Sequence, residues 1–505
     1  MGATRTDVDL LALHELFPER YPALLESVSG ADALGHTDLL FALPGPRLVQ
    51  RPDGALAGDA PHVPGMRFLD ALDAWGKWGH ADFPADRGHA DFRQGENPGI
   101  SGTSDRPSDE ASDRVASPGA GRGEDSGKIG VSPFNRKIGV SPNFRAGWFL
   151  YLGYELAAEI EPTLVLPRST LPRAVAWQMR GAVLRDRRTG EIDVRAGDAA
   201  LEAALRRQLE ADLDALERRP AASPTPGPLA LDVTEQDPAT FTAGVAQVLE
   251  AIARGDVYQA NLSRAWRARL APGATAASLY RALRRHNPAP FAGIADLGGF
   301  TVLSSSPERL LELRDGVAST RPIAGTRPRG ATPAADAALV RELRLNEKEQ
   351  AEHVMLVDLE RNDLGRICRG GSVHVDEYMT IETYATVHHI VSNVRGTLRE
   401  GVTPGEAIAA VFPGGTITGC PKVRCMQLLA DLERAPRDAY TGALGYLDSG
   451  GNLDLNILIR TLTVHDGEIG FRTGAGIVAD SVAESELAET RAKANGVLRA
   501  LGDGP

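Results

Sequence analysis

The sequence predicts a mixed α/β protein built around antiparallel sheets. From about residue 238 onward, helical periodicities alternate with short runs rich in β-branched residues. Two tight turns, DSGGN at 448–452 and HDGE at 465–468, join neighbouring runs of this kind directly. Because so short a connection links antiparallel neighbours, the pattern favours antiparallel sheets over a doubly wound parallel sheet.

The chain divides into four parts by composition. Residues 1–83 and 146–235 mix apolar runs with turns, and we expect a strand near 174–186, a helix at about 199–218 and a linker around 220–228. Residues 84–145 are rich in Gly, Ser, Asp, Arg and Pro and include a near-perfect tandem copy, KIGVSPFNR then KIGVSPNFR. So polar a segment cannot bury enough apolar surface to offset its ordering, and we therefore expect a disordered insertion.

Residues 236–505 carry the densest pattern and form the expected catalytic part. The predicted helices lie at 238–254, 335–364 and 421–434, with a closing helix capped by Asp480 or Ser481 and ended by Gly502. The predicted strands lie near 299–306, 372–375, 388–396, 441–448, 456–465 and 468–473.

Charge and composition exclude several classes of function. The chain has 505 residues, 42% of them hydrophobic, and 67 acidic residues against 55 basic ones give a net charge of −12. Without a basic run, a nucleic-acid surface or an anionic membrane surface is not expected. No apolar stretch approaches the roughly 18 residues of a membrane helix, no signal pattern opens the chain, and the three cysteines, Cys368, Cys420 and Cys425, form no metal or disulfide pattern. These features predict a cytoplasmic protein.

Two distant segments carry the same spacing of carboxylates. Glu349 and Glu352 are three residues apart, as are Glu486 and Glu489, and residues three apart share one face of a helix. Four such acids from two helices suit a hard cation such as Mg²⁺. The alternative is a pair of solvated helix faces, but Glu486, Glu489 and Lys493 form a stripe beside the apolar line of the closing helix.

Several shorter motifs offer further polar groups. Gly474, Ala475 and Gly476 end a predicted strand, where open backbone N–H groups can receive an anion, although a β-bulge would leave the same pattern. The loop FPGGTITGCPK at 412–422 precedes a helix and lacks the Lys-Ser/Thr of a nucleotide P-loop. Of the adjacent histidines His388 and His389, a β alternation turns one inward.

Taken together and in order, these segments resemble the chorismate-utilising enzymes, the family of anthranilate synthase component I, aminodeoxychorismate synthase component I, isochorismate synthase and salicylate synthase. The resemblance rests on GDVYQANLSR, SSSPERL, RPIAGTRPR, KEQAEHVMLVDLERNDLGR, VHHIVS, FPGGTITGCPKVRCM, AYTGALGY, LDLNILIRT and GAGIVADSVAESELAETRAKA. It implies an α/β (α+β) fold of the anthranilate synthase component I type, with two packed antiparallel sheets flanked by helices.

The resemblance also implies an Mg²⁺ site that bridges protein acids and the ring carboxylate of chorismate. Glu352 and Glu489 resemble direct metal ligands, and Glu349 and Glu486 resemble ligands that act directly or through water.

The same resemblance assigns roles around the substrate. Tyr440 and Arg460 match positions that hold the enolpyruvyl carboxylate, and His389 and Glu308 match groups that assist loss of the C4 hydroxyl. The cradle for the ring end corresponds to Thr416, Gly474, Ala475, Gly476 and Lys493.

Two positions bear on which member of the family the chain resembles. Gln259 stands where the water-adding members carry a Lys base, and a neutral amide favours amination instead. YQANL at 258–262, ITG at 417–419 and LNI at 455–457 resemble aminodeoxychorismate synthase component I. Ala324 departs from its Pro-Ile-Lys-Gly-Thr pattern, in which the Lys attacks C2 before ammonia enters at C4. Because several matching segments outweigh this one position, we expect amination at C4. The alternative is that ammonia attacks C2 and leads to anthranilate.

The partners follow from what the sequence lacks. No Gly-x-Cys-x-Gly nucleophile elbow surrounds a cysteine, so ammonia would come from a separate glutamine amidotransferase subunit. The motif LLES, with Glu26 and Ser27, resembles the tryptophan pocket of the family, and its alternative is a structural helix end. A hypothesis of another class is an inactive chorismate-binding regulatory subunit.

Overall fold

All strand pairings among the described residues are antiparallel, as the turns predict. The computed structural model describes residues 8–28, 36–77, 144–219, 227–384 and 387–502. The chain divides into one compact unit of residues 1–79 and 137–505 and a second of residues 80–136, which lies outside the described residues. Most of the expected insertion (84–143) and of the expected linker (220–226) lies outside them as well.

The strands form two sheets that are joined through the long strands β2 and β5. The order in the first sheet is β6 (Ile192–Ala196), the second half of β5 (Ala174–Asp186), the first half of β2 (Thr37–Gln50), β1 (Ala23–Glu26), β9 (Phe291–Asp296), β10 (Phe300–Ser306), β19 (Thr461–His465), β20 (Glu468–Ile477), β8 (Gln259–Leu270) and β7 (Ala230–Glu235). The short strand β16 (Gly419–Cys420) pairs with the start of β8.

The second sheet contains the other halves of these two strands. Its order is β3 (Leu56–Ala57), β2, β5, β4 (Gly147–Leu152), β17 (Ala443–Asp448), β18 (Leu453–Ile457), β11 (Arg309–Arg314), β12 (Val317–Arg321), β15 (Val387–Thr397) and β14 (His374–Thr383), with β13 (Ile323–Pro328) also on β15. A register shift between Pro44 and Arg47 marks the point where β2 passes from one sheet to the other.

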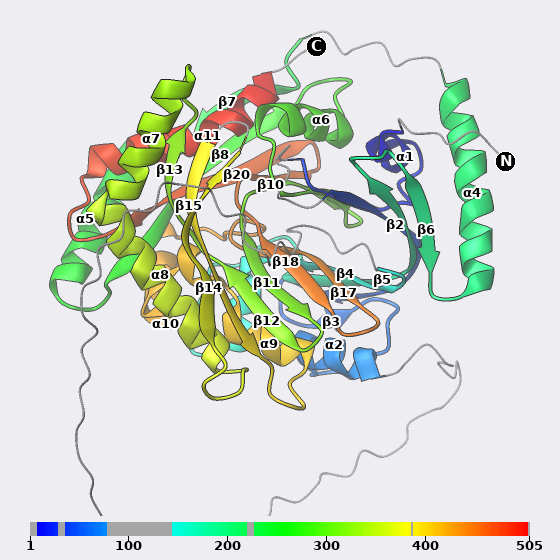
Figure 1. Ribbon diagram of the computed structural model, residues 1–505, viewed down its shortest axis with the longest axis horizontal. Helices are drawn as coiled ribbons and strands as arrows, with labels where there is room; N and C mark the ends of the chain where they lie inside the picture. The colour runs from blue at the N-terminus through cyan, green and yellow to red at the C-terminus, as the bar shows by residue number, and fades with distance from the viewer. Residues whose placement is uncertain (1–7, 29–35, 78–143, 220–226, 385–386, 503–505) are drawn as a thin grey trace, which may run out of the picture. The chain divides into compact units, whose positions relative to one another are not determined.

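Helices cover both sheets (Figure 1). On the first sheet lie α1 (Leu10–Leu16), α4 (Ala199–Arg218), α5 (Pro238–Ala253), α6 (Ala276–His286) and α11 (Ala483–Gly502). On the second lie α2 (Phe68–Lys77), α7 (Pro333–Leu345), α8 (Glu347–Gly365) and α9 (Pro404–Val411), while α10 (Lys422–Glu433) packs on β8 and β16. The short helices are η1 (Tyr154–Leu156), α3 (Ala157–Ile160) and η2 (Gly415–Ile417).

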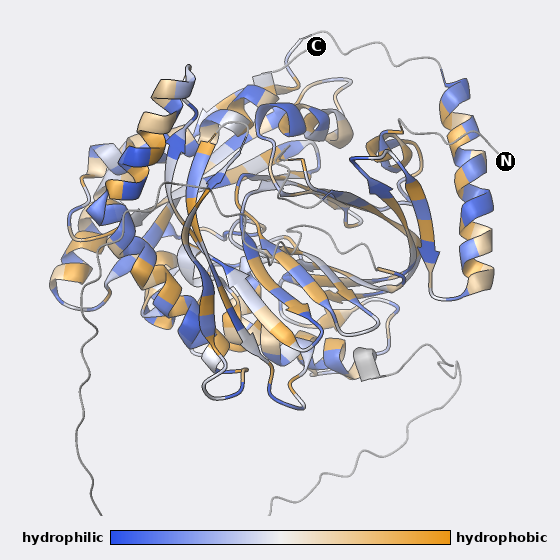
Figure 2. Ribbon diagram, in the orientation of Figure 1, coloured by the Kyte–Doolittle hydropathy of each residue, from blue (hydrophilic) through white to orange (hydrophobic). Residues whose placement is uncertain are grey.

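The apolar core is layered in the same way. A cluster that includes Phe41 and Val302 from the first sheet and Phe149 and Tyr446 from the second lies between the sheets. Two larger clusters lie outside this layer, one between the first sheet and its helices and the other between the second sheet and its helices. Figure 2 shows the resulting alternation, since helices such as α4 carry hydrophobic positions at intervals among hydrophilic ones. The two-sheet fold flanked by helices is thus confirmed.

Two predicted elements are divided in the structure. The helix expected at 335–364 is interrupted at Asn346, whose extended backbone ends α7 and whose side chain accepts a hydrogen bond of 3.0 Å from the Glu349 amide to cap α8. The strand expected at 456–465 is interrupted before Arg460, whose φ of 51° is left-handed. By contrast, α4 and β5 have the predicted bounds.

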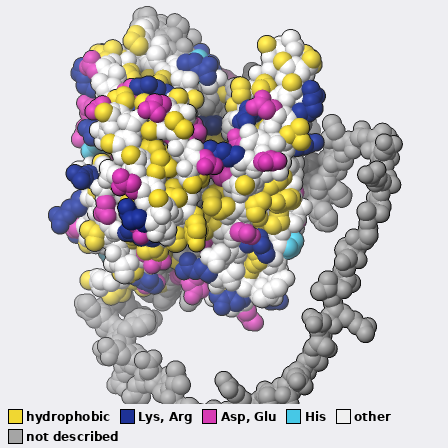
Figure 3. Space-filling view, turned by 90° about the vertical axis from the view of Figure 1, so that its left-hand side faces the viewer, with side chains coloured by type: hydrophobic (Ala, Val, Ile, Leu, Met, Phe, Trp, Pro, Cys, Tyr) yellow, Lys and Arg dark blue, Asp and Glu magenta, His cyan; other side chains and the backbone are white. Residues whose placement is uncertain are grey.

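The surface agrees with the charge pattern of the sequence. Figure 3 shows acidic, basic and hydrophobic side chains interspersed on one face, without a continuous basic area. In the described part of the chain, no helix combines the length and apolarity needed to cross a bilayer.

Candidate active site

The loop between β10 and β11 holds a buried carboxyl group, that of Glu308. Its Oε1 accepts a hydrogen bond of 2.7 Å from Oγ1 of Thr416 in the turn η2. Burial raises the pKa of Glu308 to about 7, although Thr416, the Ile323 amide and the charges of Lys493 and Arg460 oppose the shift. A carboxyl group with this pKa can hold a proton at neutral pH and give it up during a reaction.

His389 lies on β15, close to the same charges. Its Nδ1 is 2.8 Å from Oγ1 of Thr326 on β13, and its buried Nε2 has no hydrogen-bond partner in the described chain. Burial, reinforced by the charge of Arg460, lowers the pKa of His389 to about 3, so the imidazole is neutral. The buried, unpartnered Nε2 is a place where a ligand group could hydrogen-bond.

The adjacent histidine is committed elsewhere. Both histidines are buried, but His388 contacts Asp336 at 2.9 Å through Nε2 and Thr383 at 2.9 Å through Nδ1. These contacts tie the start of α7 to β14 and β15. Of the two histidines, His389 therefore is the one available to the site.

Arg460 supplies a positive charge between β18 and β19. Its guanidinium interacts electrostatically with Glu308 and Tyr384, and burial lowers its pKa. These interactions act at longer range, and within the described chain no ion pair or hydrogen bond engages this guanidinium. A partly buried cation without a paired carboxylate is suited to an anionic ligand.

The small residues of β20 allow other side chains to close over the strand. The register with β8 is continuous from Glu468 to Ile477, so residues 474–476 form a regular strand and not a bulge. A methyl group on Gly474 would lie 2.6 Å from Oη of Tyr440, and one on Gly476 would lie 2.6 Å from Nε2 of Gln259. Ala475 is buried between these glycines.

Lys493 of α11 lies over the same strand. Its Nζ donates a hydrogen bond of 3.0 Å to the Gly474 carbonyl and pairs with Glu489 at 2.7 Å. Tyr440, which also lies close to Gly474, is buried, and its pKa is raised to about 12, chiefly by burial. A cation and a phenol thus both lie near Gly474.

The first carboxylate pair lies on α8. Gln259 donates a hydrogen bond of 3.0 Å to Oε1 of Glu352, while Oε1 of Glu349 pairs with Arg327 at 3.1 Å. Burial and then the charge of Glu349 raise the pKa of Glu352, with a further contribution from Glu489 of α11. Glu352 and Glu489, from the two distant pairs, are therefore electrostatic neighbours.

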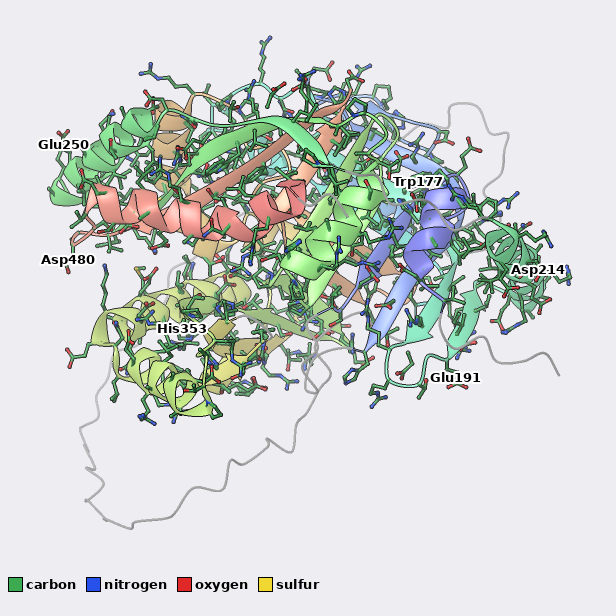
Figure 4. The ribbon with its side chains drawn as sticks, turned by 90° about the horizontal axis from the view of Figure 1, so that it is seen from above. Trp177, Glu191, Asp214, Glu250, His353 and Asp480 are labelled. Atoms are coloured by element: carbon green, nitrogen blue, oxygen red, sulfur yellow. The ribbon has the colours of Figure 1, made fainter. Side chains whose placement is uncertain are left out.

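The second pair lies on α11, which Figure 4 shows on the other side of a gap from the helices near His353, and the electrostatic effect of Glu489 on Glu352 links the two. Glu486 is buried, and burial followed by the charge of Glu489 raises its pKa, against opposing contributions from Ser481, Lys348 and Lys493. Oxygen donors that repel one another in a partly buried space fit a hard divalent cation. Among the described residues, however, no three acidic, His or Cys side chains converge closely enough to hold a metal, so binding a cation would require these glutamates to draw together.

Position 324 offers no nucleophile. Ala324 is buried on β13 opposite Ile390, and the next residue, Gly325, lies against Glu349. The methyl side chain of Ala324 cannot form a covalent adduct.

Glu26 and Ser27 lie apart from this group, at the end of β1. Glu26 accepts hydrogen bonds from Arg187 at 2.8 Å, Tyr280 at 2.8 Å and Arg284 at 3.0 Å. Oγ of Ser27 is buried without a hydrogen-bond partner in the described chain. The cavity beside Glu26 has a volume of about 20 Å³, which is room for little more than one water molecule.

Two groups of the site were missed by the sequence analysis. Thr326 orients His389, and Tyr384 packs edge-on against His389 with ring centroids 5.5 Å apart. Thr326 lies in the quoted segment RPIAGTRPR, but only the pairing of β13 with β15 places it opposite His389. Tyr384 follows β14, and only the tertiary structure brings it to His389.

The chain is similar to known proteins over most of its length. A model of the family described as chorismate binding enzyme matches residues 120–499, a range that contains every residue of the site from Gln259 to Lys493. A Synechocystis protein named anthranilate synthase component I-like protein is 41% identical over 380 residues, which cover 74% of this chain and 77% of the relative. Aminodeoxychorismate synthase component 1 of Bacillus subtilis is 45% identical over 290 residues, 57% of this chain and 61% of the relative.

A solved structure resembles nearly the whole chain. The crystal structure of anthranilate synthase component I from Streptococcus pneumoniae TIGR4 matches with a TM-score of 0.71 and 28% identity, covering 92% of each chain. The names of these relatives include both aminating activities.

Proposed function

The chain belongs to the chorismate binding enzymes, and on that premise we propose that it adds ammonia to C4 of chorismate, as component I of an aminodeoxychorismate synthase. The observation that carries this proposal is the group formed by Glu308, His389 and Arg460. It combines a carboxyl group that titrates near pH 7, a neutral imidazole with a free nitrogen and an unpaired guanidinium. Loss of a hydroxyl from an anionic substrate needs such groups.

Arg460 and Tyr440 bind the enolpyruvyl carboxylate in this proposal. The guanidinium has the fork geometry that suits a carboxylate, and no described residue forms an ion pair or a hydrogen bond with it. Thr416, Lys493 and the backbone of residues 474–476 cradle the ring end. The glycines matter because a side chain at either position would occupy the space of Tyr440 or Gln259.

Glu308 protonates the departing C4 oxygen, which leaves as water. His389 holds the same oxygen through its free Nε2. Glu352 and Glu489 would hold Mg²⁺, assisted by Glu349 and Glu486, and the chemistry supplied by the bound ion is polarisation of the ring carboxylate. The raised pKa values of Glu352 and Glu486 support this assignment, because a cation would offset both the burial and the neighbouring like charges that raise them.

Gln259 supports amination over hydration. Its amide is held by Glu352 and cannot take a proton from water, whereas ammonia needs no activating base. The ammonia would come from a separate glutamine amidotransferase subunit, a partner that the "component" names of the relatives also support. Retention of such a subunit on the immobilised protein, together with glutamine-dependent turnover, tests this pairing.

Anthranilate synthesis is the second candidate, and Ala324 is the observation that favours it. Without an amine at position 324, amination at C4 has to proceed by direct attack or through another nucleophile. The segments 258–262, 417–419 and 455–457 still favour the C4 product.

One incubation distinguishes the two products. Purified protein is given chorismate, Mg²⁺ and an ammonium salt, with and without a separate aminodeoxychorismate lyase. We expect 4-aminobenzoate only when the lyase is added. Fluorescent anthranilate without the lyase would establish the second candidate, and no Mg²⁺-dependent consumption of chorismate under any condition would leave the inactive regulatory subunit.

A further inference from the structure

Three polar side chains of β8 lie on the same face of the sheet as the glycines of β20. Gln259, Asn261 and Ser263 are two residues apart, and side chains at this spacing point to one face of a strand. In the register between the strands, Asn261 is opposite Gly476 and Ser263 is opposite Gly474. The row of polar side chains therefore borders the space that the two glycines leave open.

The middle side chain of this row differs from the outer two. Gln259 donates its hydrogen bond to Glu352, and the Ser263 hydroxyl donates one of 2.8 Å to Glu433. Oδ1 of Asn261, by contrast, is buried and has no hydrogen-bond partner among the described residues. A buried carbonyl oxygen that accepts no hydrogen bond is costly in a folded chain, so this atom points to a ligand that donates one.

The backbone of Asn261 is fixed on both sides. Its N–H donates a hydrogen bond of 2.9 Å to the Thr418 carbonyl, and its own carbonyl accepts one of 2.7 Å from the Arg437 guanidinium. Arg437 is held in turn by the buried carboxylate of Glu433 at 2.7 Å. Because both main-chain groups are engaged, the position of the side-chain oxygen is set before any ligand arrives.

The neighbours of this oxygen place it beside the substrate of the proposed function. A methyl group on Gly474 would meet Oδ1 of Asn261 and, at 2.6 Å, Oη of Tyr440, so both atoms border the same small space. In the proposed function Tyr440 binds the enolpyruvyl carboxylate, and the enolpyruvyl group of chorismate is attached through an oxygen to C3. Since C3 lies between C2 and C4, Asn261 is close to the carbons that ammonia can attack.

The chemistry of the reactants limits what this oxygen can bind. An amide oxygen only accepts hydrogen bonds, and the ionised carboxylates of chorismate also only accept them, so neither carboxylate is a partner. The C4 hydroxyl is held by Glu308 and His389 in the proposed function. Ammonia has three N–H donors and one lone pair, so it can donate to Asn261 and still direct its lone pair at the ring.

We propose that Oδ1 of Asn261 accepts a hydrogen bond from the ammonia nucleophile and thereby directs the lone pair of ammonia toward the ring. The inference rests on the proposed function. The lone pair forms the C–N bond at C4 while the C–O bond breaks, and the oxygen leaves as water with a proton from Glu308. The ammonium group so formed gives one proton back to the Glu308 carboxylate, so the site ends each turnover with the protons it had. Asn261 orients the nucleophile and exchanges no proton.

The first test is saturation kinetics of Asn261→Ala with an ammonium salt as the source of ammonia. Loss of one neutral hydrogen bond should raise the KM for ammonia roughly tenfold and leave the KM for chorismate within about twofold of the native value. A raised KM for chorismate with an unchanged KM for ammonia would mean that the amide holds chorismate, and would overturn the proposal. A native rate that rises linearly with ammonia and never saturates would overturn it without any variant.

Asn261→Leu separates a role in binding from a role in stability. Leucine is similar in size and has no polar atom, so the change removes a buried acceptor that has no partner, and the Tm of the unliganded protein should not fall. The KM for ammonia should rise as it does in Asn261→Ala. A lower Tm with equal rises in both KM values would identify a structural residue and overturn the proposal.

A matched control is Asn393→Ala. Asn393 also lies on a strand, β15, but its side-chain amide donates a hydrogen bond of 2.6 Å to Asp376. Both KM values of this variant should be native, and a KM for ammonia that rose equally in both alanine variants would contradict a role specific to Asn261.

The native protein separates this inference from the proposed function. Anthranilate as the native product, with the same rise in the KM for ammonia in Asn261→Ala, would keep the inference and move the attack to C2. Amination at C4 with an unchanged KM for ammonia in that variant would remove the inference alone. A native protein that never consumes chorismate would remove both.

Discussion

Glu26 is buried and Glu352 is partly buried, but the charges around these two glutamates differ. Glu26 is surrounded by Arg187, Arg284 and Tyr280, each within hydrogen-bond distance. Glu352 has only the Gln259 amide as a direct partner among the described residues and feels the like charges of other glutamates. One carboxylate has its partners within the fold, whereas the other lacks a cation of its own.

The difference separates a structural site from a binding site by electrostatics alone. A buried charge whose partners are supplied by the protein contributes to stability only as part of its network, and removing it leaves the partners unpaired. A cluster of like charges destabilises the fold until a ligand of opposite charge binds. The same Glu→Gln change should therefore have opposite effects at Glu26 and Glu352.

The largest effect is expected for Glu352→Gln on activity. Loss of a direct ligand should lower Mg²⁺-dependent kcat/KM by at least the roughly 100-fold that supporting residues of metal sites cost. The same variant should be more stable than the native protein without Mg²⁺, because it removes a repelled carboxylate. Steady-state kinetics and thermal unfolding with and without Mg²⁺ measure both effects.

The pH dependence of that stability gives a sign to check. The pKa of Glu352 is raised, so the native state binds its proton more tightly than the unfolded chain does and loses stability as pH rises above the ordinary range of Glu. The gain in Glu352→Gln should be larger at pH 8 than at pH 5. A variant that kept Mg²⁺-dependent activity, or lost stability at pH 8, would contradict the cation site.

The next largest effect is expected for Glu26→Gln on stability. The neutral side chain removes the carboxylate that Arg187 and Arg284 share; Arg187 keeps Asp38 and Arg284 keeps Asp9, and the broken buried network should still cost about 3 kcal/mol. Urea denaturation measures this loss, and ammonia-dependent activity of the folded fraction should persist. An unchanged unfolding midpoint would mean that the network around Glu26 is not structural.

The glycines of β20 show how closely the candidate site is packed. Gly474→Ala would place a methyl group against Tyr440, Asn261 and the Leu262 carbonyl, and such overpacking costs about 1–3 kcal/mol. Gly470→Ala on the same strand is the matched control, because its methyl group would meet only Thr463, at 3.3 Å. We expect loss of chorismate consumption in the first variant and near-native activity in the second, and equal rates would contradict a substrate cradle at Gly474.

The smallest effect is expected for Ser27→Ala. Its hydroxyl is buried without a partner in the described chain, so its removal should stabilise the protein by up to about 1 kcal/mol. Titration with tryptophan tests the alternative that this hydroxyl binds a ligand. A rise in Tm or a fall in rate with tryptophan, lost in Ser27→Ala, would turn the region around Glu26 from a structural site into a binding site.

The sequence by itself determined the local features of this protein. The bounds of α4 and β5, the antiparallel turns and the i,i+3 spacing of both carboxylate pairs depend on neighbouring residues, and hydrophobic period and turn chemistry are readable from the chain. Only the tertiary structure decided which charges are balanced. Glu26 and Arg187 are 161 residues apart, and Glu308 and Thr416 are 108 apart. No local spacing encodes such contacts, and because burial and partners together set the pKa of a carboxyl group, the acids that hold a proton could not be told from those that hold an arginine.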